Sequence, residues 1–251
     1  MDIDKGNIRT SFRLAKDKRN QTSVKPILFN GMMVRAILDG RKTVTRRVLK
    51  PQPMIESTIY PNIDVAGKVC TEIWGNGAVK YIKQPYHRGD ILWVRETWGD
   101  YREETMDGES GYFYLYRADY PDGATSIPLP ESERTDYADS WDLPKWHPSI
   151  HMPKEAARIW LRVTDVLVER LQEIGGNGLR AEGFDIPCLP NEVEDQFNKY
   201  GAIFDLEQAK KSFSALWDST IKPADREKYG WAANPWVWVI EFERCEMPEE
   251  A

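Results

Sequence analysis

The chain has 251 residues, of which 41% are hydrophobic and 29% are charged, a balance typical of globular proteins. Its net charge of -6 is unevenly spread, since residues 1–50 hold thirteen Lys or Arg against four Asp or Glu. A wholly basic nucleic-acid-binding surface is therefore excluded, whereas a local basic site on an acidic body is not.

No apolar run reaches the roughly 18 residues of a membrane helix, so we expect no membrane partner. The three cysteines Cys70, Cys188 and Cys245 lie far apart and form no CxxC motif. This usage argues against a disulfide framework and predicts a cytoplasmic protein.

Residues 1–24 mix charged and polar groups without an apolar signal core, and we expect a flexible N-terminal arm there. Residues 26–30, PILFN, predict a short strand that ends at Asn30, a residue type suited to cap a helix.

The segment GMMVRAILD that follows places Met33, Ala36 and Ile37 on one helical face. Gly40 stands where helices commonly end. The octet GRKTVTRR, residues 40–47, is therefore predicted to lead from a helix into an extended segment, and it holds four cations and two threonines.

Further strands are predicted by β-branched, aromatic and alternating residues at 88–98, 111–118, 158–171 and 234–243. Loops with short strands are expected at 51–88, and a short helix at 178–184. A longer helix is predicted after Asp205, which would serve as its N-terminal cap. Its apolar residues recur at helix spacing: Leu206, Ala209, Phe213, Leu216 and Trp217. Several strands with few helices predict an α+β fold, either a small β-barrel or a twisted sheet, with helical and loop insertions.

The order of three motifs resembles the ASCH family of the PUA-like superfamily. The octet supplies G-x-K-x-x-T-x-R, GDILWVRE follows at 89–96, and RAEGF lies at 180–184. A phage and prophage branch of that family is similar over about residues 25–243. The chain departs from the small members by its length and by GGNG at 175–178, which we interpret as a turn.

The resemblance implies one PUA-like β-barrel domain over 25–245, with insertions at about 119–149 and 191–221. It also implies a cleft that binds RNA or a modified nucleoside, with DNA as a further possibility and no cofactor. Some small ASCH proteins are amidohydrolases of 4-N-acetylcytidine, and their catalytic residues would fall on Lys42, Thr45 and Glu182. The alternatives are a binding module, such an amidohydrolase, or a phage structural or host-interaction protein whose insertions contact a protein partner.

The side chains of Lys42, Thr45 and Glu182 are of the kinds that an amidohydrolase needs. A threonine hydroxyl beside a neutral lysine can serve as an oxygen nucleophile, and burial and nearby cations lower a lysine pKa. Glu182 would orient Lys42 or move a proton to the leaving nitrogen, although an ionised carboxylate would raise the lysine pKa. Residues three apart in a regular strand face opposite ways, so the enzyme hypothesis requires residues 41–44 to be bent. The simpler interpretation is that these cations complement a helix C-terminus.

Ligand contacts are predicted for the remaining octet cations and for the second motif: Arg41, Arg46, Arg47, Trp93, Arg95, Glu96 and Trp98. The tryptophans would stack bases or pack in the core, and Tyr86 is a weaker stacking candidate. Arg95 and Glu96 would line a cleft or form a cross-strand ion pair. His147 and His151 lack partners for a zinc set, and we expect no metal.

Overall fold

A computed structural model describes residues 12–13, 22–52, 68–73, 79–104, 110–120, 146–184 and 202–248. The chain forms two compact units, each built from three separate stretches. Unit 1 comprises Met1–Ser23, Gly40–Asp90 and Arg162–Glu243, and unit 2 comprises Val24–Asp39, Ile91–Leu161 and Arg244–Ala251. One domain over 25–245 stays a prediction, as does the flexible arm, of which residues 12–13 and 22–24 are described.

The main sheet has the strand order β2-β6-β9-β10-β3, with β1 added on β9. These strands are β1 (Phe12–Arg13), β2 (Val24–Leu28), β3 (Val44–Val48), β6 (Ile91–Arg95), β9 (Trp160–Arg170) and β10 (Trp236–Cys245). The sheet is mixed, because β2 pairs with β6 in parallel and β3 pairs with β10 antiparallel. An α+β fold is thus confirmed, but this path of described strands is open rather than closed into the expected barrel.

Two antiparallel hairpins stand outside this sheet. One joins β4 (Lys68–Ile73) to β5 (Val79–Lys83), as expected of short strands within 51–88. The other joins β7 (Trp98–Glu104) to β8 (Ser110–Tyr116), and the predicted strand at 111–118 falls on its second arm. Much of the 119–149 insertion, residues 121–145, lies outside the described residues.

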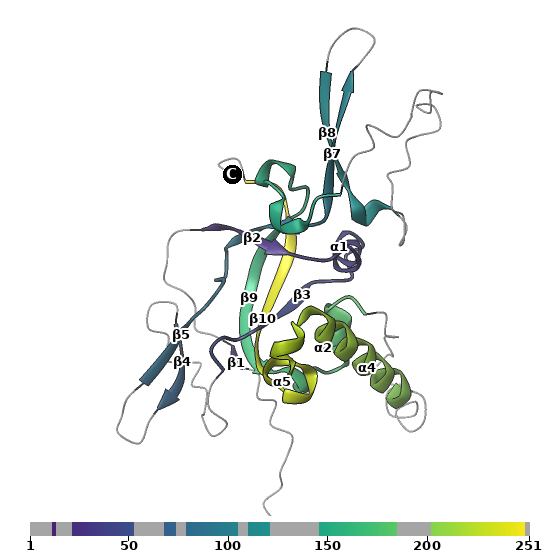
Figure 1. Ribbon diagram of the computed structural model, residues 1–251. Helices are drawn as coiled ribbons and strands as arrows, with labels where there is room; N and C mark the ends of the chain where they lie inside the picture. Colours follow the sequence, from purple (N-terminus) through teal and green to yellow (C-terminus); the bar gives the residue numbers. More distant parts are fainter. Residues whose placement is uncertain are drawn as a thin grey trace, which may run out of the picture. The chain divides into compact units, whose positions relative to one another are not determined.

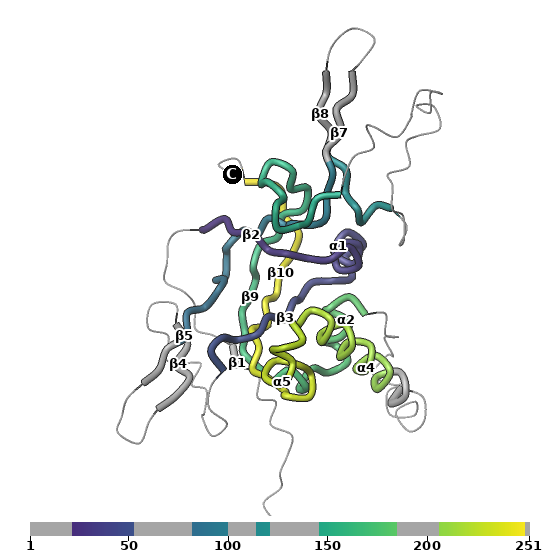
Figure 2. The backbone as a smooth tube through the Cα atoms, viewed as in Figure 1, coloured from purple at the N-terminus to yellow at the C-terminus, as the bar shows by residue number. Residues whose placement is uncertain are grey.

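In unit 1 the helices pack on one face of β3 and β10 (Figure 1). They are α2 (Gly176–Ala181), α4 (Ala202–Thr220), α5 (Arg226–Tyr229) and the 3-10 turns η5 (Leu171–Glu173), η6 (Pro223–Asp225) and η7 (Trp231–Ala233). Their shared core consists of Val44, Leu171, Ile174, Leu179, Phe213, Trp217, Val237 and Val239. Figure 2 shows how an early segment, β3, lies beside the last strand, β10.

The helix predicted from Leu206 to Trp217 is confirmed, but its cap is not. Asp205 lies inside α4, which begins at Ala202. Phe213 and Trp217 are buried as the spacing predicts. Residues 191–201 of this insertion lie outside the described residues.

Unit 2 contains α1 (Gly31–Leu38) with the 3-10 turns η1 (Arg117–Asp119), η3 (Ser149–His151) and η4 (Lys154–Ala156). Asn30 caps α1 as predicted, since its side-chain oxygen accepts the Met33 N–H at 2.9 Å. The buried positions of α1 are Val34, Ala36 and Ile37. After the helix, Gly40 has a φ of 74°, a left-handed conformation that glycine adopts without strain.

Candidate functional site

The GRKTVTRR octet bends once between helix and strand, within unit 1. The Thr43 N–H donates to the carbonyl of Ala181, whereas the Thr43 carbonyl accepts from Phe242 of β10. Lys42 forms an isolated bridge with Glu182, and regular strand β3 begins only at Val44. The chain therefore changes its pairing partner at Thr43, whereas the bend that the enzyme hypothesis requires of residues 41–44 stays a prediction.

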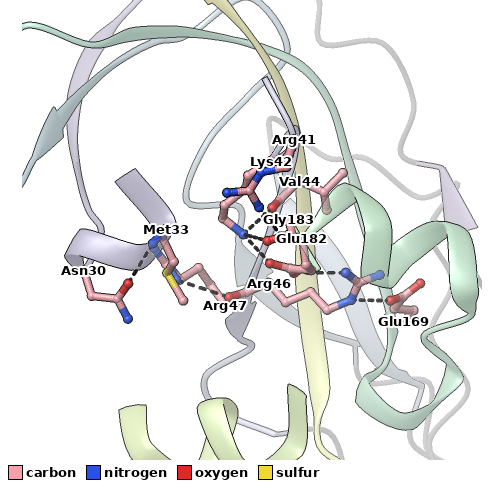
Figure 3. Close-up of polar contacts among 10 residues, drawn as sticks. All are labelled: Asn30, Met33, Arg41, Lys42, Val44, Arg46, Arg47, Glu169, Glu182 and Gly183. Atoms are coloured by element: carbon pink, nitrogen blue, oxygen red, sulfur yellow. Dashed lines mark hydrogen bonds and ion pairs between the residues drawn. The ribbon is translucent and has the colours of Figure 1, made fainter. Parts of the chain in front are cut away.

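Lys42 and Glu182 meet across 140 residues of chain. The Lys42 ammonium contacts one oxygen of the Glu182 carboxylate and also donates to the carbonyls of Val44 at 2.7 Å and Glu182 at 3.2 Å (Figure 3). The Lys42 side chain is 0% exposed and that of Glu182 is 5% exposed. The resemblance predicted this pair of residues, and the short helix α2 delivers the glutamate at its C-terminal cap.

Arg46 extends the cluster on the opposite side of Glu182 (Figure 3). Its Nη1 donates to the second Glu182 oxygen at 3.0 Å, and its Nε donates to Glu169 of β9 at 2.8 Å. Both bonds are ion pairs inside the unit, because the Arg46 side chain is 4% exposed. Arg46 therefore holds two acids in place, and the ligand contact expected of it stays a prediction.

Electrostatics keeps Glu182 ionised. Burial alone would raise the pKa of its carboxyl, but the charges and hydrogen bonds of Lys42 and Arg46 lower it below the ordinary value. Burial lowers the pKa of Lys42, with smaller contributions from Arg47 and Arg46, and Glu182 opposes this shift. A buried amine held near a fixed carboxylate is an arrangement typical of proton-transfer sites.

Thr45 is buried in β3 directly opposite Ile240 of β10. Residues directly opposite one another share a sheet face, so Thr45 lies on the face away from Val44 and the helices. No hydrogen bond joins its hydroxyl to Lys42 or Glu182 among the described residues. Of the three predicted catalytic residues, the structure thus brings Lys42 and Glu182 together but not Thr45.

Arg41 and Arg47 are the more accessible cations of the octet. Arg41 is exposed, and its Nη1 donates to the carbonyl of Gly183 at 2.7 Å. Arg47 is half-buried in β3. Desolvation lowers the pKa of Arg47, and its charge acts on Tyr86 and Glu182. Arg47 and the half-buried Tyr86 therefore interact electrostatically, and the stacking role of Tyr86 stays a prediction.

The other four candidates belong to unit 2. Glu96 is 1% exposed and accepts two hydrogen bonds from Arg158 at 2.9 and 3.0 Å. The ion-pair alternative is thus realised for Glu96, although its partner is Arg158 and not a residue named from the sequence. Arg95 donates to the carbonyl of Ile150 and lies 5.3 Å from the Trp93 ring centroid. Trp98 contacts the rings of Tyr114 and His147.

Sequence reasoning missed Glu169 and Arg158, the partners of Arg46 and Glu96. Glu169 offers one signal, since it follows the apolar run Val166–Val168 within a strand. Arg158 precedes its strand and offers none. The described residues contain no cluster of three or more His, Cys, Asp or Glu able to hold a metal ion.

Comparison with protein-family models, curated proteins and solved structures gives no match. Within the described part of the chain, no helix is both long enough and apolar enough to cross a membrane.

Proposed function

We propose that unit 1 binds a nucleobase or a nucleic-acid segment at the octet, in the manner of an ASCH protein of phage or prophage type. RNA or a modified nucleoside is the expected ligand, with DNA as a further candidate. The motif order GRKTVTRR, GDILWVRE and RAEGF supports this proposal.

The observation that carries the proposal is the buried cluster of Lys42, Arg46, Glu169 and Glu182. Transferring charges from water into a protein interior costs several kcal/mol per ion, and hydrophobic side chains of similar volume often stabilise a fold as well or better. Such a cluster therefore adds little to the stability of a fold that binds no ligand. Its charged groups have a function if they recognise a polar ligand with donors and acceptors on one edge, such as a base.

Groups at the edge of the cluster support such a ligand. The exposed Arg41 would contact a phosphate, and the half-buried Arg47 and Tyr86 would supply a cation and an aromatic ring. Phosphate binding releases counterions, so affinity falls as the salt concentration rises. For a single strand, each lost phosphate contact makes the plot of log affinity against log salt less steep by about 0.7.

The test measures binding of a fluorescent single-stranded RNA at several salt concentrations. Arg41→Ala and Arg47→Ala are expected to weaken binding and lower the salt slope. Lys211→Ala, which removes an exposed lysine of α4 in the same unit, is the matched control. Equal affinities and slopes for all four proteins would refute the proposal.

The Lys42–Glu182 contact favours a second candidate, the deacylation of a 4-N-acetylcytidine-like nucleoside. In this reaction neutral Lys42 takes the proton of Thr45, whose oxygen attacks the acyl carbon. The exocyclic nitrogen leaves with a proton passed through Glu182, and water then releases acetate from Thr45. Thr45 lies on the other face of β3 and shares no hydrogen bond with Lys42 in this structure, so this candidate requires β3 itself to rearrange when the ligand binds.

Acetate release from 4-N-acetylcytidine tests this candidate. The wild-type protein is expected to release acetate, whereas Thr45→Ala and Glu182→Gln are expected to be inactive. Thr43→Ala is the control, since Thr43 is an exposed threonine two residues away. Equal and negligible release from wild type and Thr45→Ala would exclude this substrate.

A further inference from the structure

Glu169 of β9 is a buried acid that belongs neither to the predicted catalytic residues nor to the predicted ligand contacts. Its side chain is 12% exposed, and one of its oxygens accepts the Nε–H of Arg46 at 2.8 Å. Within the part of the chain that the structure describes, this is its only ion pair and its only side-chain hydrogen bond. Glu169 therefore acts on the rest of the site through Arg46.

The charges of the cluster alternate in sign along one line of contacts (Figure 3). Arg46 lies between the two acids, since its Nη1 donates to Oε1 of Glu182 at 3.0 Å. Oε2 of Glu182 contacts the Lys42 ammonium, so each oxygen of this carboxylate meets one cation. The order of the charges is Lys42, Glu182, Arg46 and Glu169. Two cations thus balance two carboxylates, whereas without Glu169 the other three groups would carry one uncompensated positive charge.

The contacts of Lys42 fit the protonated amine. Its Nζ donates to the carbonyls of Val44 and Glu182 at 2.7 and 3.2 Å and contacts the Glu182 carboxylate. An ammonium has three N–H donors, as many as these acceptors, whereas a neutral amine has two. The charged groups that act on Lys42 are Glu182, Arg47 and Arg46. Because Arg46 is bound to Glu169, a change at Glu169 reaches Lys42 through the cluster.

Helix α2 confines the Arg46 side chain. A Cβ added at Gly178 would lie 3.0 Å from Nη2 of Arg46, closer than the roughly 3.5–4.0 Å of an ordinary contact. The Arg46 side chain is 4% exposed, and within the described ranges its ion-pair partners are Glu169 and Glu182 alone. Arg46 is thus held by α2 and by two acids, and loss of one acid leaves its charge in place beside the other.

We propose that Glu169 is a positioning residue of the unit 1 site, which through Arg46 holds the Glu182 carboxylate against Lys42 and favours the protonated form of that amine. Loss of the Glu169 charge leaves Arg46 uncompensated, and an uncompensated cation nearby disfavours an ammonium. Lys42 then loses its proton to water at a lower pH. Neutral Lys42 is the base in the deacylation candidate, so the consequence of Glu169 for that reaction rests on the proposed function.

The test measures the pH at which Lys42 loses its proton, from the 13Cε signal of the lysine-labelled full chain by NMR. Lys42→Met identifies the signal. Glu169→Gln keeps the size of the side chain and an acceptor for Arg46 but removes the charge, so its Lys42 midpoint should lie at lower pH than that of wild type. Glu173→Gln, which removes an exposed carboxylate of the same unit, is the matched control and should keep the wild-type midpoint.

A second variant, Glu169→Asp, separates charge from position. It keeps the carboxylate but shortens the side chain by one methylene, so Arg46 stays partly compensated. Its Lys42 midpoint should lie between those of wild type and Glu169→Gln. Circular dichroism establishes which variants are folded, and if Glu169→Gln does not fold, Glu169→Asp supplies the comparison with wild type.

Acetate release from 4-N-acetylcytidine tests the consequence for the reaction. Glu169→Gln should reach half of its maximal kcat at a lower pH than wild type, because its base becomes neutral at a lower pH. If the wild type releases no acetate, the deacylation candidate fails, while the Lys42 midpoints still decide the role of Glu169.

Two outcomes would overturn the proposal. One is the same Lys42 midpoint in wild type and in folded Glu169→Gln, or in Glu169→Asp where that variant alone folds. A lower Tm without a shifted midpoint is the result that a purely structural role of Glu169 predicts. The other is a midpoint that moves to higher pH, which would mean that Arg46 leaves Glu182 when position 169 carries no charge.

Discussion

Replacing Glu182 with glutamine should destabilise the protein strongly while hardly changing side-chain volume. Glu182 binds Lys42 through one oxygen and Arg46 through the other, and none of the three side chains is more than 5% exposed. Glutamine retains one acceptor and turns an NH₂ group toward a cation. Breaking a buried ion pair by removing one partner typically costs about 3–5 kcal/mol. Arg46 keeps Glu169, so the lower end, about 3 kcal/mol, is expected.

This loss corresponds to a fall in Tm of roughly 6–12 °C for a chain of this size. Urea unfolding followed by tryptophan fluorescence would measure the free energy directly. The matched control is Glu173→Gln, an exposed carboxylate of unit 1, which should stay within about 0.5 kcal/mol of wild type.

A double-mutant cycle identifies the cause. Adding Lys42→Met to Glu182→Gln removes the stranded ammonium, so the double variant should lose less than the sum of the single losses, by about 1–3 kcal/mol. If the free energy of unfolding of Glu182→Gln lies within about 0.5 kcal/mol of the wild-type value, the cluster is solvated and its charges are not buried.

Four other predictions concern pH, packing and the backbone. The pKa of Glu182 is lowered in the folded state, so its stabilisation is complete above the ordinary value of 4.5 and disappears as the pH falls through the folded pKa. The stability gap between wild type and Glu182→Gln should therefore narrow in acid, and a gap independent of pH from 7 to 3 would contradict this. Burial raises the pKa of Glu96 in the folded state, although Arg158 opposes this shift. The contribution of Glu96 to the free energy of unfolding therefore depends on pH in the opposite way to that of Glu182, and it is lost as the pH rises through the folded pKa of Glu96. Phe213→Ala should cost about 3–5 kcal/mol in urea unfolding, because the ring is 4% exposed and contacts Phe184, Trp217 and Trp231; a loss below about 1 kcal/mol would show that the site collapses around the change. Gly40→Ala should cost about 1–2 kcal/mol through its positive φ alone, since no atom lies within 4 Å of an added Cβ, and a Tm equal to that of wild type would refute this assignment.

The local structure around the octet was predictable because short-range chemistry determines it. Asn30 caps α1, Gly40 follows it with a positive φ, and β3 lies in the segment predicted to be extended. Long β9 and β10 also follow from their runs of β-branched and aromatic residues. These features depend on neighbours within a few residues, which a sequence displays directly.

Long-range pairing was less predictable. The Lys42–Glu182 contact was anticipated only through family resemblance, since nothing local relates residues so far apart. Glu169 escaped notice because a strand glutamate normally faces solvent, and its partner Arg46 was assigned to a ligand. Closure of a sheet into a barrel depends on the pairing of its edges, which strand patterns do not encode.

The distance along the chain between Lys42 and Glu182 has a consequence during synthesis. A ribosome adds about 5–20 residues per second, so the 140 residues that separate the pair take roughly 7–28 s to make. Throughout that time the nascent chain holds a lysine destined for the interior without its counterion. A translation product that stops before residue 182 would never acquire it, and cellular proteases should remove such a fragment faster than the complete chain.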